Sequence, residues 1–395
     1  MAEINETLKE KYEATQKDFE QKIRRHRRAI VYRSVIGIAI VIALIASAYI
    51  NYQKMVYTDY EVTRSISYPE ASNAKYVSFG DNVLRYSQDG ASAFNIANDM
   101  MWNETFEMQN PIVDTCGDYA ALGDYMGTNI YIYNSEGLQG TIDTSTPLKR
   151  FCVSGNGSVA VVIEDDDVTW VKLYDVNGIN IASDRTTMSK SGYPVCIDIS
   201  EDGILMAVSY LFVDSGVLSS SVAFYNFGAV GQNEVDNLVS GYNYPGTVVS
   251  YVSFMNPTTS FAVGDDGLSI FKGSEKPESI IKQDIDKEII SVFYNDKNIV
   301  LVLEDEEENR YIAEVYDDNG NPVATQRFDM DYSDIAVYKD LLIIYNSEEC
   351  QIYNMAGLKK YEGRFENPVI TMIPEKARSR YLLVCGSGME EIKLK

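Results

Sequence analysis

Residues 171–178 read Val-Lys-Leu-Tyr-Asp-Val-Asn-Gly, a short alternating strand that ends in a tyrosine and passes into a turn. A tyrosine ring packs well on a half-buried strand, an Asp or Asn side chain caps a turn, and glycine takes the positive φ that a tight turn needs. The same combination occurs at residues 130–137, 222–228, 314–320 and 351–357. The chain is therefore predicted to consist of repeated β-hairpin units.

The spacing of these units indicates the architecture. Tyr133 and Tyr174 are 41 residues apart, and Tyr316 and Tyr353 are 37 residues apart. A second pattern precedes the turns, in which an apolar strand, a polar reverse turn and another apolar strand follow each other, most clearly over residues 196–208. A period of about 40 residues without helical periodicity is typical of four-stranded propeller blades.

In this second pattern the sequence resembles the WD40-like and PQQ-type propeller superfamilies, where such a turn joins the two innermost strands of a blade. The resemblance extends over most of residues 58–395. The Trp-Asp dipeptide of WD40 repeats is missing, because Trp102 is followed by Asn and Trp170 by Val. The resemblance therefore implies a propeller that is not a true WD40 protein.

Counting the units predicts an all-β fold, a seven- or eight-bladed β-propeller over residues 58–395. The count gives eight blades, and seven is the alternative. The units start near Lys75, Ile112, Arg150, Val195, Ser250, Ile289, Asp334 and Ile370. The last unit has room for only three strands. Residues 60–67 are expected to supply the fourth strand and close the ring, which removes exposed sheet edges. Two stacked β-sandwich domains are the alternative architecture.

An uncharged run over residues 34–50, SVIGIAIVIALIASAYI, contains nine Val, Ile or Leu residues. Such a run predicts a transmembrane helix that acts as a signal anchor and binds the chain to the membrane. Lys and Arg crowd its N-terminal side, so the positive-inside rule places residues 1–33 in the cytoplasm and the C-terminal domain outside. The alternative is a cleaved signal peptide, because Ala46-Ser47-Ala48 resembles a cleavage site.

The basic tail, residues 1–33, has strong helix formers and no Gly or Pro over residues 5–28, which predicts a short cytoplasmic helix. This helix is either a docking helix that uses a sparse apolar stripe or a solvated helix held near anionic lipid. A basic tail, one span and Tyr-rich blades together resemble a domain-of-unknown-function family of single-pass, propeller-bearing membrane proteins of Gram-positive bacteria. That resemblance implies the topology and the fold and brings no activity.

The net charge of −24 is unevenly distributed. Residues 1–33 carry nine Lys or Arg and six Asp or Glu, a net of +3, so the remainder carries −27. A surface this acidic repels phosphate backbones, which argues against nucleic-acid binding and is typical of a domain kept soluble by its charge.

The residue types available limit the chemistry. His26, the only histidine, lies in the tail, which leaves the large domain without a histidine base or an imidazole metal ligand. The acidic runs 164–167 and 304–308 lack the spacing of a calcium loop and are interpreted as hairpin tips. No catalytic, cofactor-binding or metal-binding residue is therefore assigned, no cofactor is expected, and the protein is predicted not to be an enzyme.

The cysteines are odd in number and have no CxxC spacing, which argues against a disulfide framework or a zinc site. Three of them, Cys116, Cys152 and Cys196, lie in short apolar stretches and are interpreted as small buried core residues. One bridge among the five, which include Cys350 and Cys385, is left open. Residues 210–221, YLFVDSGVLSSS, interrupt their unit either as a projecting insertion or as the extended strands of one long hairpin.

The function predicted from these observations is a membrane-anchored, extracytoplasmic platform that binds a protein partner or a cell-envelope ligand without catalysis. The first alternative is a transmembrane sensor that relays ligand binding to the cytoplasmic helix. A carboxylate-based glycan hydrolase is the second alternative, because two suitably spaced acids suffice for glycoside hydrolysis.

Overall fold

The structure, a computed structural model, describes residues 26, 32–45, 47 and 54–395, the last range without 68–73, 96, 98, 166–167, 187–190, 306–309, 376, 378 and 387. The chain divides into two compact units, Met1–Val56 and Tyr57–Lys395. In the first unit, residues 32–45 form a helix whose large apolar side chains, Ile36 and Leu44 among them, are more than half exposed. Across the described part of the chain, no helix combines the length and the apolarity needed to span a bilayer.

The predicted membrane span, residues 34–50, thus coincides with a described helix over residues 34–45, whereas residues 46 and 48–50 lie outside the described residues. The predicted cytoplasmic helix, residues 5–28, lies outside them too, apart from His26.

The second unit is a ring of eight four-stranded antiparallel sheets, the blades of a propeller. Blades 1 to 4 comprise β2(Lys75–Phe79), β3(Asn82–Tyr86), β4(Gly90–Phe94) and β5(Met100–Thr105); β6(Pro111–Cys116), β7(Tyr119–Asp124), β8(Asn129–Asn134) and β9(Gly137–Asp143); β10(Leu148–Val153), β11(Val159–Asp165), β12(Val168–Tyr174) and β13(Asn180–Thr186); β14(Tyr193–Ile199), β15(Leu205–Asp214), β16(Val217–Asn226) and β17(Leu238–Tyr244). Two 3₁₀ turns, η1(Gly231–Asn233) and η2(Val235–Asn237), precede β17.

Blades 5 to 8 continue the same up-and-down order. They comprise β18(Val249–Asn256), β19(Thr259–Gly264), β20(Gly267–Lys272) and β21(Glu278–Asp284); β22(Ile289–Tyr294), β23(Asn298–Asp305), β24(Arg310–Asp317) and β25(Pro322–Phe328); β26(Asp334–Tyr338), β27(Leu341–Tyr345), β28(Glu349–Asn354) and β29(Lys359–Arg364); β30(Val369–Pro374), β31(Arg380–Cys385), β32(Gly388–Leu394) and β1(Tyr60–Ser67). The prediction of an all-β propeller is confirmed with eight blades, and the sandwich alternative is wrong.

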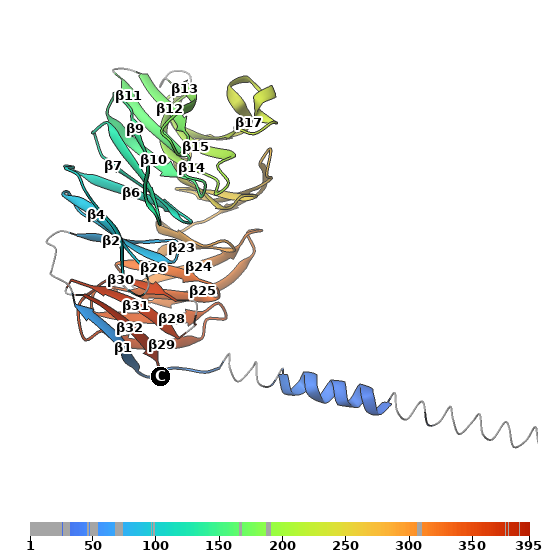
Figure 1. Cartoon of the computed structure of the whole chain (residues 1–395). Coiled ribbons are helices and arrows are strands. Elements are labelled where there is room, and N and C mark those ends of the chain that lie inside the picture. Colours follow the sequence, from blue (N-terminus) through green and yellow to red (C-terminus); the bar gives the residue numbers. More distant parts are fainter. Residues whose placement is uncertain are drawn as a thin grey trace, which may run out of the picture. The chain divides into compact units, whose positions relative to one another are not determined.

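Blade 8 closes the ring with strands from both ends of the domain. β1 pairs with β32 in antiparallel register from Tyr60 opposite Leu394 to Ser67 opposite Gly388. Figure 1 shows the blue strand β1 beside the red strands β31 and β32 near the C-terminus. The expected fourth strand over residues 60–67 is thus confirmed, and the outer edge of β32 is covered.

The core lies between neighbouring blades, so the middle strands are buried on both faces. β23 shows the result in sequence, because Ile299, Val300, Leu301, Val302 and Leu303 are consecutive and at most 1% exposed. Their side chains alternate between two apolar clusters, one on each side of the blade. Burying both faces explains continuous apolar runs where a one-sided sheet would alternate.

Four of the five predicted tyrosine turns are tight hairpins, whereas after Asn226 a longer connection with η1 and η2 leads to β17. The Asp175 carboxylate accepts hydrogen bonds from the backbone N–H groups of Asn177 (3.0 Å) and Ile179 (2.7 Å), which lowers its pKa. Gly178 follows with a φ of +79°. Each such turn connects the third and fourth strands of its blade.

The ring has two faces, which are named here by the direction of the innermost strands. The amino face is the side where β2, β6, β10 and their equivalents begin, and the carboxyl face is the side where they end. Tyrosine turns lie on the carboxyl face, and hairpins between second and third strands lie on the amino face. The chain enters the ring at the carboxyl face, where the Tyr57 N–H donates to the Lys360 carbonyl at 2.7 Å.

Candidate functional site

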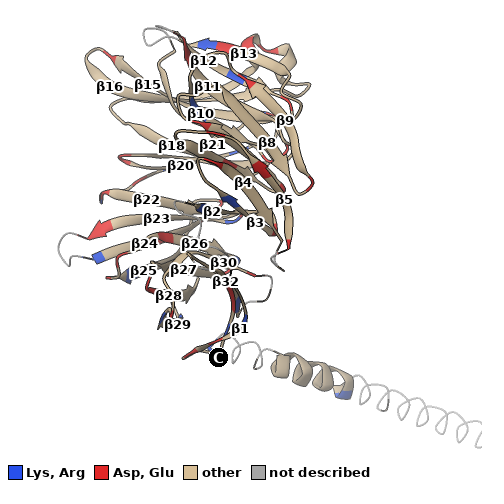
Figure 2. Ribbon diagram, turned by 60° about the vertical axis from the view of Figure 1, so that its left-hand side comes forward, with Lys and Arg blue, Asp and Glu red and all other residues tan. Residues whose placement is uncertain are grey.

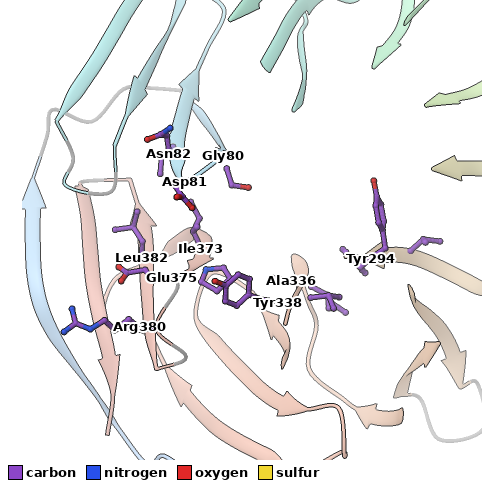
Figure 3. A pocket seen from close by; sticks show the side chains of 18 of the residues that line it. Gly80, Asp81, Asn82, Tyr294, Ala336, Tyr338, Ile373, Glu375, Arg380 and Leu382 are labelled. Carbon is purple, nitrogen blue, oxygen red and sulfur yellow. The ribbon is translucent and has the colours of Figure 1, made fainter. Parts of the chain in front are cut away.

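A cavity of about 820 Å³ opens between the innermost strands at the carboxyl face. Its walls come from blades far apart in sequence: the β2–β3 turn around Asp81, Tyr251 of β18, and the ends of β22, β26 and β30. Figure 3 shows Gly80 and Asp81 of blade 1 near Ile373 of blade 8, with Tyr294 of blade 6 on the opposite side. The ring closure that pairs β1 with β32 is what brings blades 1 and 8 together here.

The cavity is apolar inside and polar at its rim. Val83, Val292, Ile335, Ile373 and Leu382 are among its apolar wall residues. The polar lining residues include Asp81, Asn82, Tyr294, Tyr338, Glu375 and Arg380. An apolar hollow with a few polar groups is the usual construction of a ligand site.

The charges at the rim are partly neutralised within the protein. Arg380 Nη1 lies 2.5 Å from Glu391 Oε1, and both groups lie near Glu375. Burial, and next the negative charge of Glu391, raise the pKa of Glu375, while Arg380 opposes the shift. The rim therefore offers hydrogen-bonding groups to a ligand, with its one Arg already paired to Glu391.

A hydrogen-bonded chain leads from the cavity wall to a buried carboxylate. The hydroxyl oxygen of Tyr294 lies 2.7 Å from Ser253 Oγ, which lies 2.6 Å from Asp198 Oδ2. Burial raises the pKa of Asp198 to about 6, although hydrogen bonds from Ser253 and the Phe254 N–H oppose it. Burial also raises the pKa of Asp114 to about 7, with a smaller contribution from the charge of Asp198.

Both buried carboxylates brace one blade against the next. Asp114 of β6 accepts the Val153 N–H of β10, and Asp198 of β14 accepts the Phe254 N–H of β18, each at 2.7 Å. Innermost strands have no neighbouring strand on the channel side, so these N–H groups would otherwise lack partners. Asp114 and Asp198 therefore already accept structural hydrogen bonds. Each can hold a proton but is not placed to attack a substrate.

Three thiols share this region and are poor nucleophiles. Burial, followed by nearby carboxylates, raises the pKa of Cys116 to about 12, and burial also raises the pKa of Cys152 and Cys196. A protonated thiol neither attacks nor binds metal. All five cysteines are free, so no bridge forms among them. Of the three predicted to be buried, Cys152 is buried, whereas Cys116 and Cys196 are only partly buried. Within the described ranges, no group of three His, Cys, Asp or Glu side chains is placed to hold a metal ion.

The sequence assigned no site residue and therefore missed Asp114, Asp198 and Tyr294. A signal was present, since Asp114 and Asp198 each interrupt an otherwise largely apolar inner strand, in Val-Asp-Thr and Ile-Asp-Ile. The partners of these acids belong to other blades, so the sequence could not show which atoms they meet.

The acidic runs lie at hairpin ends. Glu164 pairs with Lys149 at 2.7 Å, and Asp305 pairs with Lys287 at 3.0 Å. Residues 166–167 and 306–309 lie outside the described residues. Residues 210–221 are the extended strands of one long hairpin, with Asp214 paired to Val217, which decides between the two interpretations of that segment.

Comparisons with known proteins support the fold. A family described as "Family of unknown function (DUF5711)" matches residues 52–394. A search of curated proteins finds no match. Among solved structures, BamB from Moraxella catarrhalis is 9% identical with a TM-score of 0.50, covering 85% of this chain and 100% of that chain.

Two further solved structures are similar. A eukaryotic initiation factor is 14% identical with a TM-score of 0.52, covering 84% of this chain and 87% of that chain. Sqt1 from Chaetomium thermophilum is 12% identical with a TM-score of 0.50, covering 87% of this chain and 98% of that chain. At these identities the likeness concerns the propeller fold alone.

Proposed function

We propose that this chain, which belongs to DUF5711, a family of unknown function, is a non-catalytic binding platform. In this proposal residues 34–50 anchor it in the membrane and the propeller lies on the extracytoplasmic side. Its partner is a protein or a cell-envelope ligand. The observation that carries the proposal is the cavity at the carboxyl face, which has apolar walls and a polar rim.

The geometry of the cavity favours binding over chemistry. The wall groups that reach it are mainly apolar, and the titratable network behind Tyr294 is engaged in bracing blades. Burial raises the pKa of the Tyr294 hydroxyl, so this group donates or accepts hydrogen bonds as a neutral phenol. A preformed apolar hollow with neutral polar groups suits a ligand that is held by shape and hydrogen bonding.

The chain joins the ring on the face that carries the cavity. The chain enters the ring at the carboxyl face, beside Lys360 and Lys395, which is also the face with the cavity. Six residues, 51–56, separate the predicted span from Tyr57. Fully extended, six residues reach about 20 Å.

Site-specific photocrosslinking in intact cells tests the proposal. A photoreactive phenylalanine analogue replaces Tyr338, a half-buried residue of the cavity wall, in the full-length protein. The matched control carries it at Val323, which is 42% exposed on the outermost strand of blade 6. We expect a discrete crosslinked product from position 338 and none from position 323.

Mass spectrometry then identifies the attached molecule as protein, glycan or lipid. Identical products from both positions, or no product from position 338 in a folded protein, would contradict a binding role for the cavity.

A further inference from the structure

A second hollow region lies on the amino face, away from the cavity. Two adjoining depressions of about 510 Å³ and 430 Å³ share Ile112 and Tyr125 as lining residues. Together they form what is called here the amino-face groove, which follows the beginnings of β2, β6, β10 and β14 in blades 1 to 4.

The charge of this groove is opposite to that of the chain. Its lining includes Lys75, Lys149 and Arg150 and no Asp or Glu. Acidic residues outnumber basic ones by 58 to 34 in the sequence, and they are spread over strands around the ring (Figure 2). Lys149 is paired with Glu164, while Lys75 and Arg150 form no ion pair with any described residue. The groove thus has two uncommitted cations for an anionic ligand.

The floor of the groove is apolar. Ile112, Val113, Phe151 and Val195 line it and are only partly buried, so each keeps surface available for contact. A glycan would place hydroxyl groups against these side chains, where their hydrogen bonds with water would be lost without replacement. A peptide can instead place aliphatic side chains on the floor and carboxylates next to the cations. The floor therefore favours an acidic peptide over an acidic glycan.

The rim is held in place by its own hydrogen bonds. The Asp124 carboxylate accepts the N–H groups of Gln109 (3.1 Å) and Asn110 (2.7 Å). Gln88 Nε2 donates to the Gln109 carbonyl at 2.6 Å, and the Tyr125 N–H donates to the Asn110 carbonyl at 3.0 Å. A rim fixed before binding costs little ordering entropy when a ligand arrives.

Exposed apolar residues continue this surface along the long hairpin of blade 4. Leu211 of the long hairpin pairs with Tyr193, which lines the groove. Past this pair the hairpin tip exposes Val213 (64%), Val217 (53%) and Leu218 (45%). Clustered apolar side chains at a rim are typical of protein interaction sites.

We infer that the amino-face groove binds an extended, acidic segment of a partner protein. Aliphatic side chains of the segment lie on the floor at Ile112 and Val195, and its carboxylates pair with Arg150 and Lys75. The inference rests on the proposed platform function and adds a second site, which binds an acidic protein segment. Opposite faces of the ring would then hold the cavity ligand and the partner segment.

Fluorescence anisotropy with the purified full-length protein tests this inference. The probe is a labelled 12-residue peptide of alternating Val and Glu, compared with versions in which Gln or Lys replaces Glu. We expect saturable binding of the Glu peptide alone, weakened by added salt because exposed charges are screened. Charge reversal in Arg150→Glu with Lys75→Glu is expected to weaken binding by about ten-fold or more.

The matched control is Lys297→Glu, which reverses an exposed charge in the β22–β23 turn on the carboxyl face and should leave binding unchanged. Equal binding of the Glu and Gln peptides, equal loss in the Lys297 variant, or tighter binding of an oligogalacturonate than of the Glu peptide would each overturn the inference.

The crosslink at position 338 separates the two proposals. If the crosslink at position 338 forms but the peptide does not bind, the groove inference is wrong and the proposed binding function of the cavity is unaffected. Absence of the crosslink with intact peptide binding would overturn the cavity as a site. Circular dichroism of each variant establishes that it is folded.

Discussion

Asp114 and Asp198 are the residues whose chemistry departs most from that of an exposed acid. Each sits in an innermost strand, is removed from solvent, and accepts an N–H from the next blade. Desolvation outweighs these hydrogen bonds and favours the protonated form. Near neutral pH the junctions between blades 2 and 3 and between blades 4 and 5 therefore contain acids that are close to their titration points.

Replacing Asp198 by Asn should reduce the dependence of stability on pH. The pKa of Asp198 rises from 3.8 to about 6 on folding, so the folded state binds the proton more tightly than the unfolded chain. The carboxyl group is therefore tolerated best below pH 4, and its charge destabilises the fold increasingly as pH rises through about 6. We expect the Tm difference between pH 5 and pH 8 to be smaller in Asp198→Asn than in the parent.

Thermal unfolding of the full-length protein at both pH values checks this. The control is Asp118→Asn, in the exposed β6–β7 turn on the carboxyl face. This variant should show the same Tm difference between pH 5 and pH 8 as the parent. An unchanged or larger pH difference in Asp198→Asn would show that this carboxyl does not titrate as described.

At the scale of elements, the sequence was most informative about turns and least informative about contacts between blades. The predicted unit starts at Lys75, Ile289 and Asp334 coincide with the first residues of β2, β22 and β26. Turns are specified largely by local chemistry, as in the hydrogen bonds of Asp175 and the positive φ of Gly178. The choice between seven and eight blades depended on pairing between the two ends of the domain, which no local pattern encodes.

The same reasoning predicts different costs for two glycine substitutions. Gly178 and Gly216 both have a left-handed φ, +79° and +83°. An added Cβ at Gly178 would lie 2.2 Å from the Thr141 carbonyl oxygen of the neighbouring blade, whereas no atom lies within 4 Å at Gly216. Gly216→Ala should cost about 1–2 kcal/mol through backbone strain alone.

Gly178→Ala should lower the free energy of unfolding by clearly more, because the backbone of another blade must move. Chemical denaturation of both variants measures the difference. Equal losses would mean that the tyrosine turn does not pack against the adjacent blade as the structure shows.

At the scale of the whole molecule, function depends on what the ring assembles from distant segments. The cavity at the carboxyl face joins Asp81 of blade 1 to Tyr294 of blade 6 and Tyr338 of blade 7, and the amino-face groove spans blades 1 to 4. The sequence predicted the ring, the acidic surface and the scarcity of catalytic residue types. It could not predict either hollow, because each is defined by side chains that meet only after closure.

The proposed function requires that the propeller, held by a membrane anchor, offers its binding surfaces outside the cytoplasm. Labelling with a membrane-impermeant maleimide tests it most directly. Val323→Cys places a thiol on the outermost strand of blade 6, and Ala2→Cys places one in the basic tail, with the parent protein as the background control. We predict that Val323→Cys is labelled in intact cells and that Ala2→Cys is labelled only after lysis. Labelling of Val323→Cys only after lysis would place the propeller inside the cell and contradict the account.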